Sequence, residues 1–141
     1  ASQTPFNLRR VIITDEKGEY GFRSVVPAGY ACPQDGPTQK LLGLLGRHGQ
    51  RPACIHFAVS APDHRSLTTQ IVIDGDEYLW RDFAFAERYE LLPKVQRVTG
   101  AEAMEKAGLD KPFAMIEFDF TLVPEKPGVP GHTVQRKRVE V

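Results

Sequence analysis

The sequence predicts an all-β fold, specifically a β-sandwich with short helices and long loops. Apolar and polar residues alternate in several short segments, the period typical of half-buried strands. Clusters of Asp, Gly and Pro separate these segments, and the helical patterns between them are short. No internal repeat is present. Several short strands separated by turns favour a sandwich or a barrel, and we expect the sandwich.

The N-terminal part predicts a β-hairpin. Residues 11–14 form a short β-branched run, and residues 20–26 alternate as a return strand. Residues 15–18 between them form a turn, with Gly18 able to take a positive φ. The Pro-Ala-Gly sequence that follows ends the hairpin and delivers Tyr30 onto a loop.

Two short helices are predicted. Turn chemistry at residues 35–38 opens the first, and the glycines at 46 and 49 break it. Its apolar stripe consists of Leu41, Leu42, Leu44 and Leu45. Residues 102–107 predict the second helix, which Gly108 closes.

Two strands are predicted in the middle of the chain. Residues 53–60 alternate, with the apolar side chains at 55, 57 and 59 on one face. Because side chains two apart share a face, Cys54 and His56 point the same way. Residues 67–73 form the second strand, which carries Gln70.

The clearest strand pattern lies at residues 115–123. Its apolar positions, which alternate with polar ones, are Ile116, Phe118, Phe120 and Leu122. One face is therefore expected to be buried and the other solvated. We expect a β-sandwich domain over residues 1–123 and a C-terminal tail over residues 124–141, which begins rich in Pro and Gly.

Composition excludes several classes of partner. Lys plus Arg is 18 and Asp plus Glu is 18, so no nucleic-acid partner is expected, and the basic run at 136–138 is taken as a solvated tail. No long apolar run and no leader pattern are present, so no membrane partner is expected. Cys32 and Cys54 do not make a disulfide framework, which favours a reducing, cytoplasmic setting, and Cys32 beside a proline is expected to be structural.

One group of side chains could carry chemistry. His56 shares a strand face with Cys54, and Gln70 lies beside them if the two strands pair. Tyr30 lies upstream, and Arg51 leads into the strand. Neutral imidazole suits iron, copper or zinc, and thiolate suits zinc or iron. On spacing alone, a Cys-x-His pair is more often a buried thiol beside a hydrogen-bonded histidine.

The remaining candidates are expected to be structural. His48, His64 and His132 are expected at the surface. The aromatic residues expected in the core or an interface are Tyr78, Trp80, Phe83 and Phe85. No Walker loop, Rossmann glycine pattern, nucleophile elbow or His-Glu-x-x-His helix is present. A Cys54–His56 nucleophile–base pair is disfavoured, because side chains two apart on a strand seldom meet in hydrogen-bond geometry.

Five segments carry linked motifs of one known family. Residues 29–38 (GYACPQDGPT) match a segment with an iron-binding tyrosine, residues 45–57 (LGRHGQRPACIHF) match an iron-histidine strand, and residues 67–71 (LTTQI) match the next strand. Residues 3–10 and 116–120 match as well. The chain therefore resembles the intradiol catechol dioxygenases over nearly its whole length, in particular the catechol 1,2-dioxygenase branch.

The resemblance implies the β-sandwich catalytic domain of a non-haem Fe(3+) oxidoreductase. Such enzymes cleave catechol with O2, between its hydroxyl-bearing carbons, to cis,cis-muconate, so the implied partners are a catechol-type small aromatic substrate and O2. Tyr30 matches the ligand that leaves the iron when catechol binds and can take up a substrate proton, and His56 matches an iron histidine. Arg51 and Gln70 match residues beside the substrate ring, where a fixed guanidinium can stabilise negative charge.

The chain departs from the family pattern at Cys54, where the family has histidine. The family's other tyrosine ligand and a helical region that makes dimer contacts are expected upstream of the matching residues, so the implied homodimer belongs to the full-length enzyme. Tyr30 and His56 keep two of the family's four ligand positions. Cys54 could supply a further donor, since thiolate binds iron well.

Two alternatives stay open. A relative that kept the fold and lost the iron would be a catalytically inactive binding or partner module. A different metal, such as zinc, could be held by Cys54, His56 and Tyr30.

Overall fold

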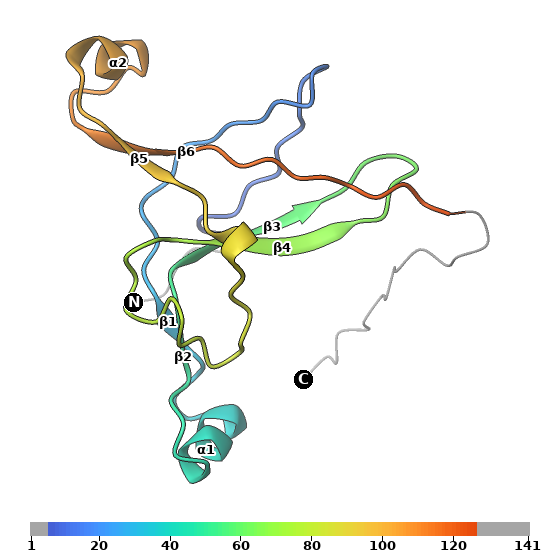
Figure 1. The fold of residues 1–141 in the computed structure, drawn as a ribbon, viewed down its shortest axis with the longest axis vertical. Coiled ribbons are helices and arrows are strands. Elements are labelled where there is room, and N and C mark those ends of the chain that lie inside the picture. Colours follow the sequence, from blue (N-terminus) through green and yellow to red (C-terminus); the bar gives the residue numbers. More distant parts are fainter. Residues whose placement is uncertain (1–5, 127–141) are drawn as a thin grey trace.

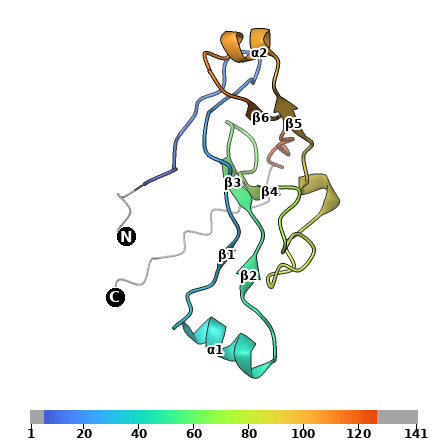
Figure 2. The same cartoon turned by 90° about the vertical axis from the view of Figure 1, so that its left-hand side faces the viewer.

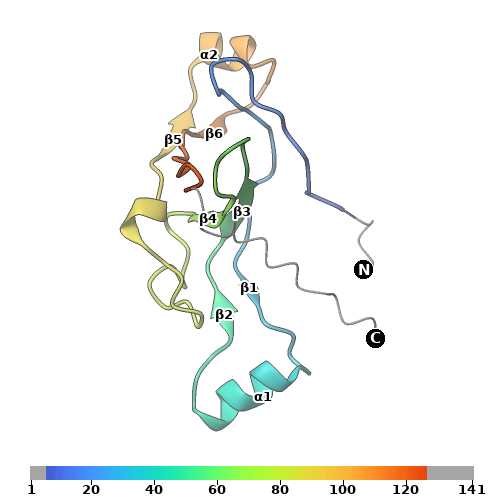
Figure 3. The same ribbon diagram turned by 90° about the vertical axis from the view of Figure 1, so that its right-hand side faces the viewer.

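The computed structural model describes residues 6–126, and these form an elongated molecule. Helix α1 (Pro37–Leu44) lies at one end, helix α2 (Ala101–Lys106) lies at the other, and the main strand pair lies between them (Figure 1). Figures 2 and 3 show the same order from two further sides. The predictions for residues 1–5, for His132 and for the basic run at 136–138 lie outside the described residues.

The main strand pair consists of β3 (Cys54–Val59) and β4 (Leu67–Val72). The strands are antiparallel, and His56 stands opposite Gln70 in their register. Both strands confirm the sequence prediction to within a residue or two at each end. Gly75, with a φ of 84°, makes the turn that ends β4, because glycine takes positive φ without a steric penalty.

Strands β1 (Tyr30–Ala31) and β2 (Gln50–Arg51) form a second ladder, which α1 connects. The predicted helix is confirmed: Gly36 precedes it, Pro37 opens it and Gly46 follows it with a φ of 65°. Its expected apolar stripe is only partly buried, because Leu42 alone of the four leucines is in the core. The prediction that Tyr30 lies on a loop was wrong, because its backbone pairs with that of Arg51.

The third ladder consists of β5 (Val95–Val98) and β6 (Phe113–Ile116), with α2 between them. A 3-10 turn, η1 (Tyr89–Leu91), precedes β5. The second predicted helix is confirmed, and Gly108 follows it with a φ of 62°. The predicted strand at 115–123 keeps its alternation of half-buried and exposed side chains, but the ladder ends at Ile116.

The predicted N-terminal hairpin forms its turn but not its ladder. The Gly18 amide donates to the Asp15 carbonyl at 3.0 Å, as a turn requires, yet residues 11–14 and 20–26 belong to no strand. Side chains hold the second segment instead. The Tyr20 hydroxyl donates to the Phe118 carbonyl at 2.6 Å, and the Tyr20 ring lies 6.4 Å from the ring of Phe57.

The all-β class with short helices and long loops is confirmed, since three two-stranded antiparallel sheets carry the fold of residues 6–126. The apolar core among the described residues is small and centred on β4. It contains Leu42, Ala53, Ile71, Val72, Ile73 and Leu79. No helix within residues 6–126 has the length and apolar character needed to cross a bilayer. The predicted boundary between a domain at 1–123 and a tail at 124–141 stays a prediction.

Candidate metal centre

Two ladders bring together all five candidate site residues. The β1–β2 register places Tyr30 opposite Arg51, and the β3–β4 register places His56 opposite Gln70. Cys54 shares the His56 face of β3, as the alternation predicts. Hydrogen bonds and short contacts then connect the two ladders through their side chains.

Three donor atoms converge at this point. The Tyr30 hydroxyl lies 3.4 Å from Nε2 of His56, and Sγ of Cys54 lies 3.4 Å from the same nitrogen. With metal–ligand bonds of about 2.0–2.3 Å, two ligands of one metal lie about 3.1 Å apart at a right angle and about 3.6 Å apart at a tetrahedral angle. Both observed separations fall between these values, so Tyr30 and Cys54 each lie at the distance from His56 that a second ligand of one metal ion would take.

The expectation that Cys54 and His56 would not meet was wrong. The two side chains leave β3 on one face, and the 3.4 Å separation lies within reach of a sulfur hydrogen bond. Within residues 6–126, no group of three or more His, Cys, Asp or Glu side chains gathers as metal ligands do. A metal centre here therefore needs the phenol oxygen of Tyr30 as its third protein donor.

Arg51 connects the donor atoms to the rest of the site. Its Nη1 donates to the Tyr30 hydroxyl at 2.7 Å, and its Nη2 donates to Oε1 of Gln70 at 3.1 Å. Its Nε and Nη2 donate to the carboxylate of Asp82 at 3.0–3.3 Å, in the two-point geometry typical of Arg–carboxylate pairs. The guanidinium is thus fixed in position beside the donors.

Asp82 is the site residue that the sequence analysis missed. Its side chain is fully buried, and its Oδ1 also accepts the Ala84 amide at 3.0 Å. Burial alone would raise the pKa of Asp82, but the hydrogen bonds from Arg51 and the Ala84 amide outweigh it and hold the pKa below its ordinary value of 3.8. A single carboxylate within the aromatic run at 78–85 was the available signal, because a charge buried among aromatics needs a partner.

Gln70 has one unmet hydrogen bond. The residue is only 7% exposed, and its Oε1 is taken by Arg51. Its Nε2 is the one buried side-chain nitrogen or oxygen within residues 6–126 that lacks a hydrogen-bond partner. Leaving a buried donor unpaired is costly, so a bound ligand with an oxygen atom would complete the site.

The surroundings raise the pKa of both acidic donors, Tyr30 and Cys54. Burial raises the pKa of the Tyr30 phenol, and the nearby Cys54 sulfur raises it further. Burial likewise raises the pKa of the Cys54 thiol, which Arg51 lowers in part. A nucleophilic cysteine needs the opposite shift, so the site does not favour a Cys54–His56 nucleophile–base pair.

Backbone contacts hold the two ladders in place. A Cβ atom on Gly29 would lie 2.9 Å from the Arg51 carbonyl oxygen, so glycine lets β1 approach β2 closely. The Asp76 carboxylate accepts the Ala53 amide at 3.0 Å, immediately before β3 begins. Asp76 thus links the turn after β4 to the strand that carries Cys54.

The other predicted residues lie outside the donor cluster. His48 and His64 are half-buried: His48 packs 5.3 Å from the Tyr78 ring, and Nδ1 of His64 lies 2.7 Å from the Pro62 carbonyl. The thiol of Cys32 donates to Oε1 of Gln39 at 3.0 Å, which fits its expected structural role.

The aromatic residues expected in the core or an interface differ in burial. Tyr78 and Phe83 are half-buried, which fits the prediction. Trp80 and Phe85 are 48% and 67% exposed, so the described chain does not bury them in its core. The Trp80 ring packs 4.5 Å from that of Tyr89, near the surface.

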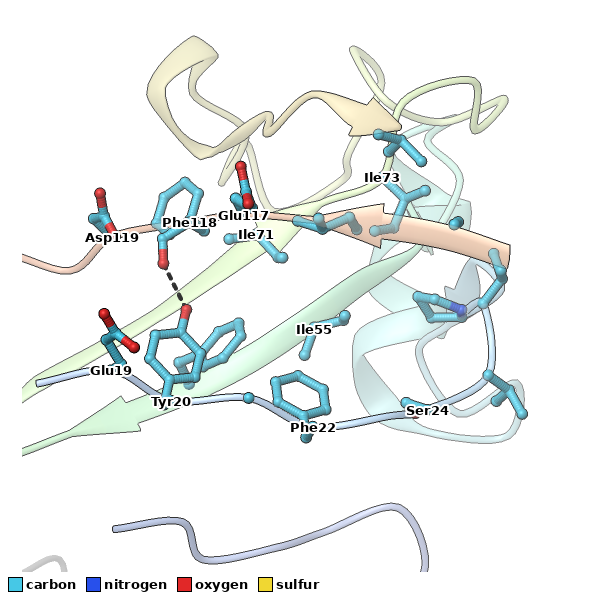
Figure 4. A pocket seen from close by; sticks show the side chains of 18 of the residues that line it. Glu19, Tyr20, Phe22, Ser24, Ile55, Ile71, Ile73, Glu117, Phe118 and Asp119 are labelled. Atoms are coloured by element: carbon cyan, nitrogen blue, oxygen red, sulfur yellow. Dashed lines mark hydrogen bonds between the residues drawn. The ribbon is translucent and has the colours of Figure 1, made fainter. Parts of the chain in front are cut away.

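An open pocket of about 640 Å³ lies on the other face of β3. Ile55, Phe57, Ile71 and Ile73 line it from the main strand pair. Residues 17–27 and the stretch after β6 close it from the sides (Figure 4). None of the five candidate site residues lines this pocket, so it is separate from the donor cluster.

The arrangement defines a class of protein: an all-β scaffold with phenol, imidazole and thiol donors beside a fixed guanidinium. Comparison with known proteins gives the family. The family model described as Dioxygenase matches residues 1–124. A catechol 1,2-dioxygenase of Acinetobacter baylyi is 50% identical over 139 residues, which cover 99% of this chain and 45% of that protein. A hydroxyquinol 1,2-dioxygenase of Rhizobium is 40% identical over 121 residues, which cover 85% of this chain and 41% of that protein.

Solved structures agree with these relatives. The wild-type catechol 1,2-dioxygenase of Acinetobacter radioresistens has a TM-score of 0.90 at 50% identity, covering 96% of this chain and 44% of that one. The chain belongs to the intradiol ring-cleavage dioxygenase family, which confirms the family and the fold expected from its motifs. The chain spans less than half the length of these relatives.

Proposed function

We propose that the protein to which this chain belongs is a non-haem iron dioxygenase that cleaves catechol with O2 to cis,cis-muconate. The observation that carries the proposal is the convergence of Tyr30, His56, Arg51 and Gln70, in a chain 50% identical to a catechol 1,2-dioxygenase. Tyr30 and His56 would hold the ferric ion. Cys54 adds a donor beside them.

A bound ferric ion would supply Lewis acidity, which would favour the doubly deprotonated catechol and its reaction with O2. The side chains of Arg51 and Gln70 bind and orient the substrate. Arg51, held by Asp82, presents a positive charge beside the donor cluster and stabilises negative charge on the substrate ring. Nε2 of Gln70, which is unpaired, donates a hydrogen bond to a substrate oxygen.

Tyr30 is suited to hold a substrate proton. Its hydroxyl oxygen accepts a hydrogen bond from Arg51 at 2.7 Å and lies beside His56. Burial raises its pKa, so the phenol keeps a proton firmly whenever the oxygen is not bound to metal. Tyr30 is thus a metal ligand that can act as a base.

The setting and the assembly are also proposals. Cys32 and Cys54 are free thiols, which supports a reducing, cytoplasmic location. A homodimer would belong to the longer protein.

Reconstitution with ferric iron tests the function. The purified chain, loaded with Fe(3+), is expected to show a broad tyrosinate-to-iron band in its visible spectrum, and catechol is expected to shift that band. Tyr30→Phe should abolish the band. Tyr89→Phe, at a tyrosine 78% exposed and outside the site, should leave it unchanged.

Replacing Cys54 sharpens the test. Cys54→His introduces the residue that the family motif has at this position, so iron per chain should rise, and muconate formation, followed by absorbance, should rise with it. Iron content that is indifferent to Tyr30 and Cys54 would overturn the proposal. That outcome would favour an inactive binding module.

A further inference from the structure

We propose that Cys54, His56 and Tyr30 form a binding site for a thiophilic divalent metal ion of the zinc class, with an oxygen ligand in the fourth position. The inference uses the site of the proposed function but does not depend on ring cleavage. It names a second metal class that this chain accepts because of Cys54.

The geometry of the donors suits such an ion. Sγ of Cys54 and the Tyr30 oxygen each lie 3.4 Å from Nε2 of His56. For mixed N, O and S ligands, a tetrahedral ion places its donors about 3.3–3.6 Å apart. Tyr30 and Cys54 are therefore each spaced from His56 as two ligands of one tetrahedral ion are.

The chemistry of sulfur sets the preference for the ion. Thiolate is a soft ligand that selects zinc-class ions, whereas ferric iron is hard and favours oxygen donors. Thiolate is also readily oxidised, and a zinc-class ion has no redox step of its own to promote this. Cys54 therefore shifts the site toward zinc relative to an all-oxygen-and-nitrogen set.

Charge balance points the same way. When a metal ion displaces the protons of the thiol and the phenol and the imidazole is neutral, the three ligands carry two negative charges, which a divalent ion neutralises. Arg51 and Asp82 form an ion pair whose charges cancel beside the site. Tyr30, which is 41% exposed, and His56 lie on the open side of the cluster, whereas Cys54 is half-buried, so charge compensation matters most at the thiolate.

An independent observation beside the cluster points to an oxygen ligand. Nε2 of Gln70 is buried and has no hydrogen-bond partner, although Gln70 stands opposite His56 in the β ladder. Arg51 holds the other end of the same amide and also contacts Tyr30. An oxygen ligand on the metal, such as water or hydroxide, would accept from this unpaired nitrogen.

Cobalt(II) is the probe for the site. We expect the full chain to bind one Co(2+) per molecule, with a near-ultraviolet thiolate-to-cobalt band and the visible bands of tetrahedral cobalt. Zinc should displace the cobalt and protect Cys54 from alkylation. Cys54→Ser should abolish the thiolate band, and His56→Gln should weaken binding roughly 10-fold or more.

Cys32→Ser is the matched control, because Cys32 is the other thiol and is already bonded to Gln39. It should keep both the band and the affinity. Circular dichroism checks that each variant folds. If Cys54→Ser does not fold, His56→Gln takes its place as the test of the site. Gln70→Leu removes the unpaired donor and should weaken cobalt binding by roughly 10-fold.

Two outcomes overturn the inference: no thiolate band at one equivalent of cobalt, or a band that survives Cys54→Ser and disappears in Cys32→Ser. The proposed function fails separately, if the iron-loaded wild-type chain shows no tyrosinate-to-iron band. A chain that shows the iron band but no cobalt–thiolate band would refute this inference and leave the dioxygenase proposal intact.

Discussion

At the scale of single residues, the position of Arg51 depends on Asp82. The guanidinium contacts Tyr30, Gln70 and Asp82, and Asp82 is the one partner that carries a charge. The Asp82 side chain is fully buried, and the Arg51 side chain is 14% exposed. Removing one member of such a pair leaves the other without compensation, which costs more than the pair itself contributes.

Asp82→Asn is therefore expected to lower the free energy of unfolding by about 3 kcal/mol at neutral pH, measured by urea denaturation. Asp110→Asn, at an exposed carboxylate, should change it by less than about 0.5 kcal/mol. Asp82→Asn should also weaken the cobalt and iron complexes, because Arg51 would no longer be held beside Tyr30. Equal losses from both variants would contradict the role of Asp82.

The effect of Asp82 depends on pH in a defined direction. Its pKa in the folded protein is held below 3.8, so its ionised form stabilises the fold above that pH and the contribution is lost as the pH falls through the folded pKa. The gap in stability between the wild type and Asp82→Asn should be complete at neutral pH and shrink below about pH 4. A gap that stays constant into strong acid would refute this assignment.

At the scale of elements, the two faces of the β3–β4 pair carry two separate features of the molecule. One face carries Cys54 and His56 into the donor cluster, and the other carries Ile55 and Phe57 into the open pocket. Register matters because a slip of one residue would exchange the two faces. Both faces of β4 are packed at residues 70–73, and a slip would take Gln70 away from its hydrogen bond with Arg51.

Val72→Ala tests the contribution of β4. Val72 is 0% exposed, so losing its two methyl groups should lower the free energy of unfolding by about 1.5–2.5 kcal/mol. Val11→Ala, at a valine 90% exposed, should change it by less than about 0.5 kcal/mol. Urea denaturation of both variants checks the difference, and equal effects would show that β4 is not the centre of the core.

Gly29→Ala tests how β1 is joined to β2. The added methyl would lie 2.9 Å from the Arg51 carbonyl oxygen, so the strands must separate at a cost of about 1–3 kcal/mol. Tyr30 follows directly, and its shift should weaken Co(2+) binding. In Gly43→Ala, within α1, the added methyl group has no atom within 4 Å. This variant should instead stabilise the chain by about 0.5–1 kcal/mol. Unchanged cobalt affinity in Gly29→Ala would contradict the close approach.

At the scale of the whole molecule, the described chain buries little and exposes much apolar surface. Val11 and Ile13 are 90% and 91% exposed, and Val25 and Val26 are 65% and 73% exposed. Val25 and Val26 line the open pocket of about 640 Å³. Apolar surface of this kind is typical of a face that another segment or protein covers.

The chain on its own is expected to bind a hydrophobic fluorescent dye in this pocket. Val25→Asp places a charge on the pocket lining and should weaken dye binding several-fold, because burying a carboxylate without a partner is unfavourable. Val11→Asp adds the same charge at a residue that does not line the pocket and should have little effect. Fluorescence titration distinguishes the two, and equal losses would place the dye elsewhere.

The sequence by itself determined the local features of this protein. The alternation at 53–60 and 67–73 predicted β3 and β4, and the shared face of Cys54 and His56 followed from the two-residue period of a strand. The glycines at 46 and 108 marked the ends of both helices. These features depend on neighbouring residues only, so periodicity and turn chemistry suffice to predict them.

Only the tertiary structure decided which distant residues meet. It placed Tyr30 on a strand opposite Arg51, joined Arg51 to Asp82 across 31 positions, and left the N-terminal hairpin without its ladder. Each of these depends on how separate segments pack, and the free energy of that packing is shared among residues far apart in the chain. The lone carboxylate in the aromatic run at 78–85 indicates a buried charge, but no local pattern names Arg51 as its partner, because the two residues meet only in the folded chain.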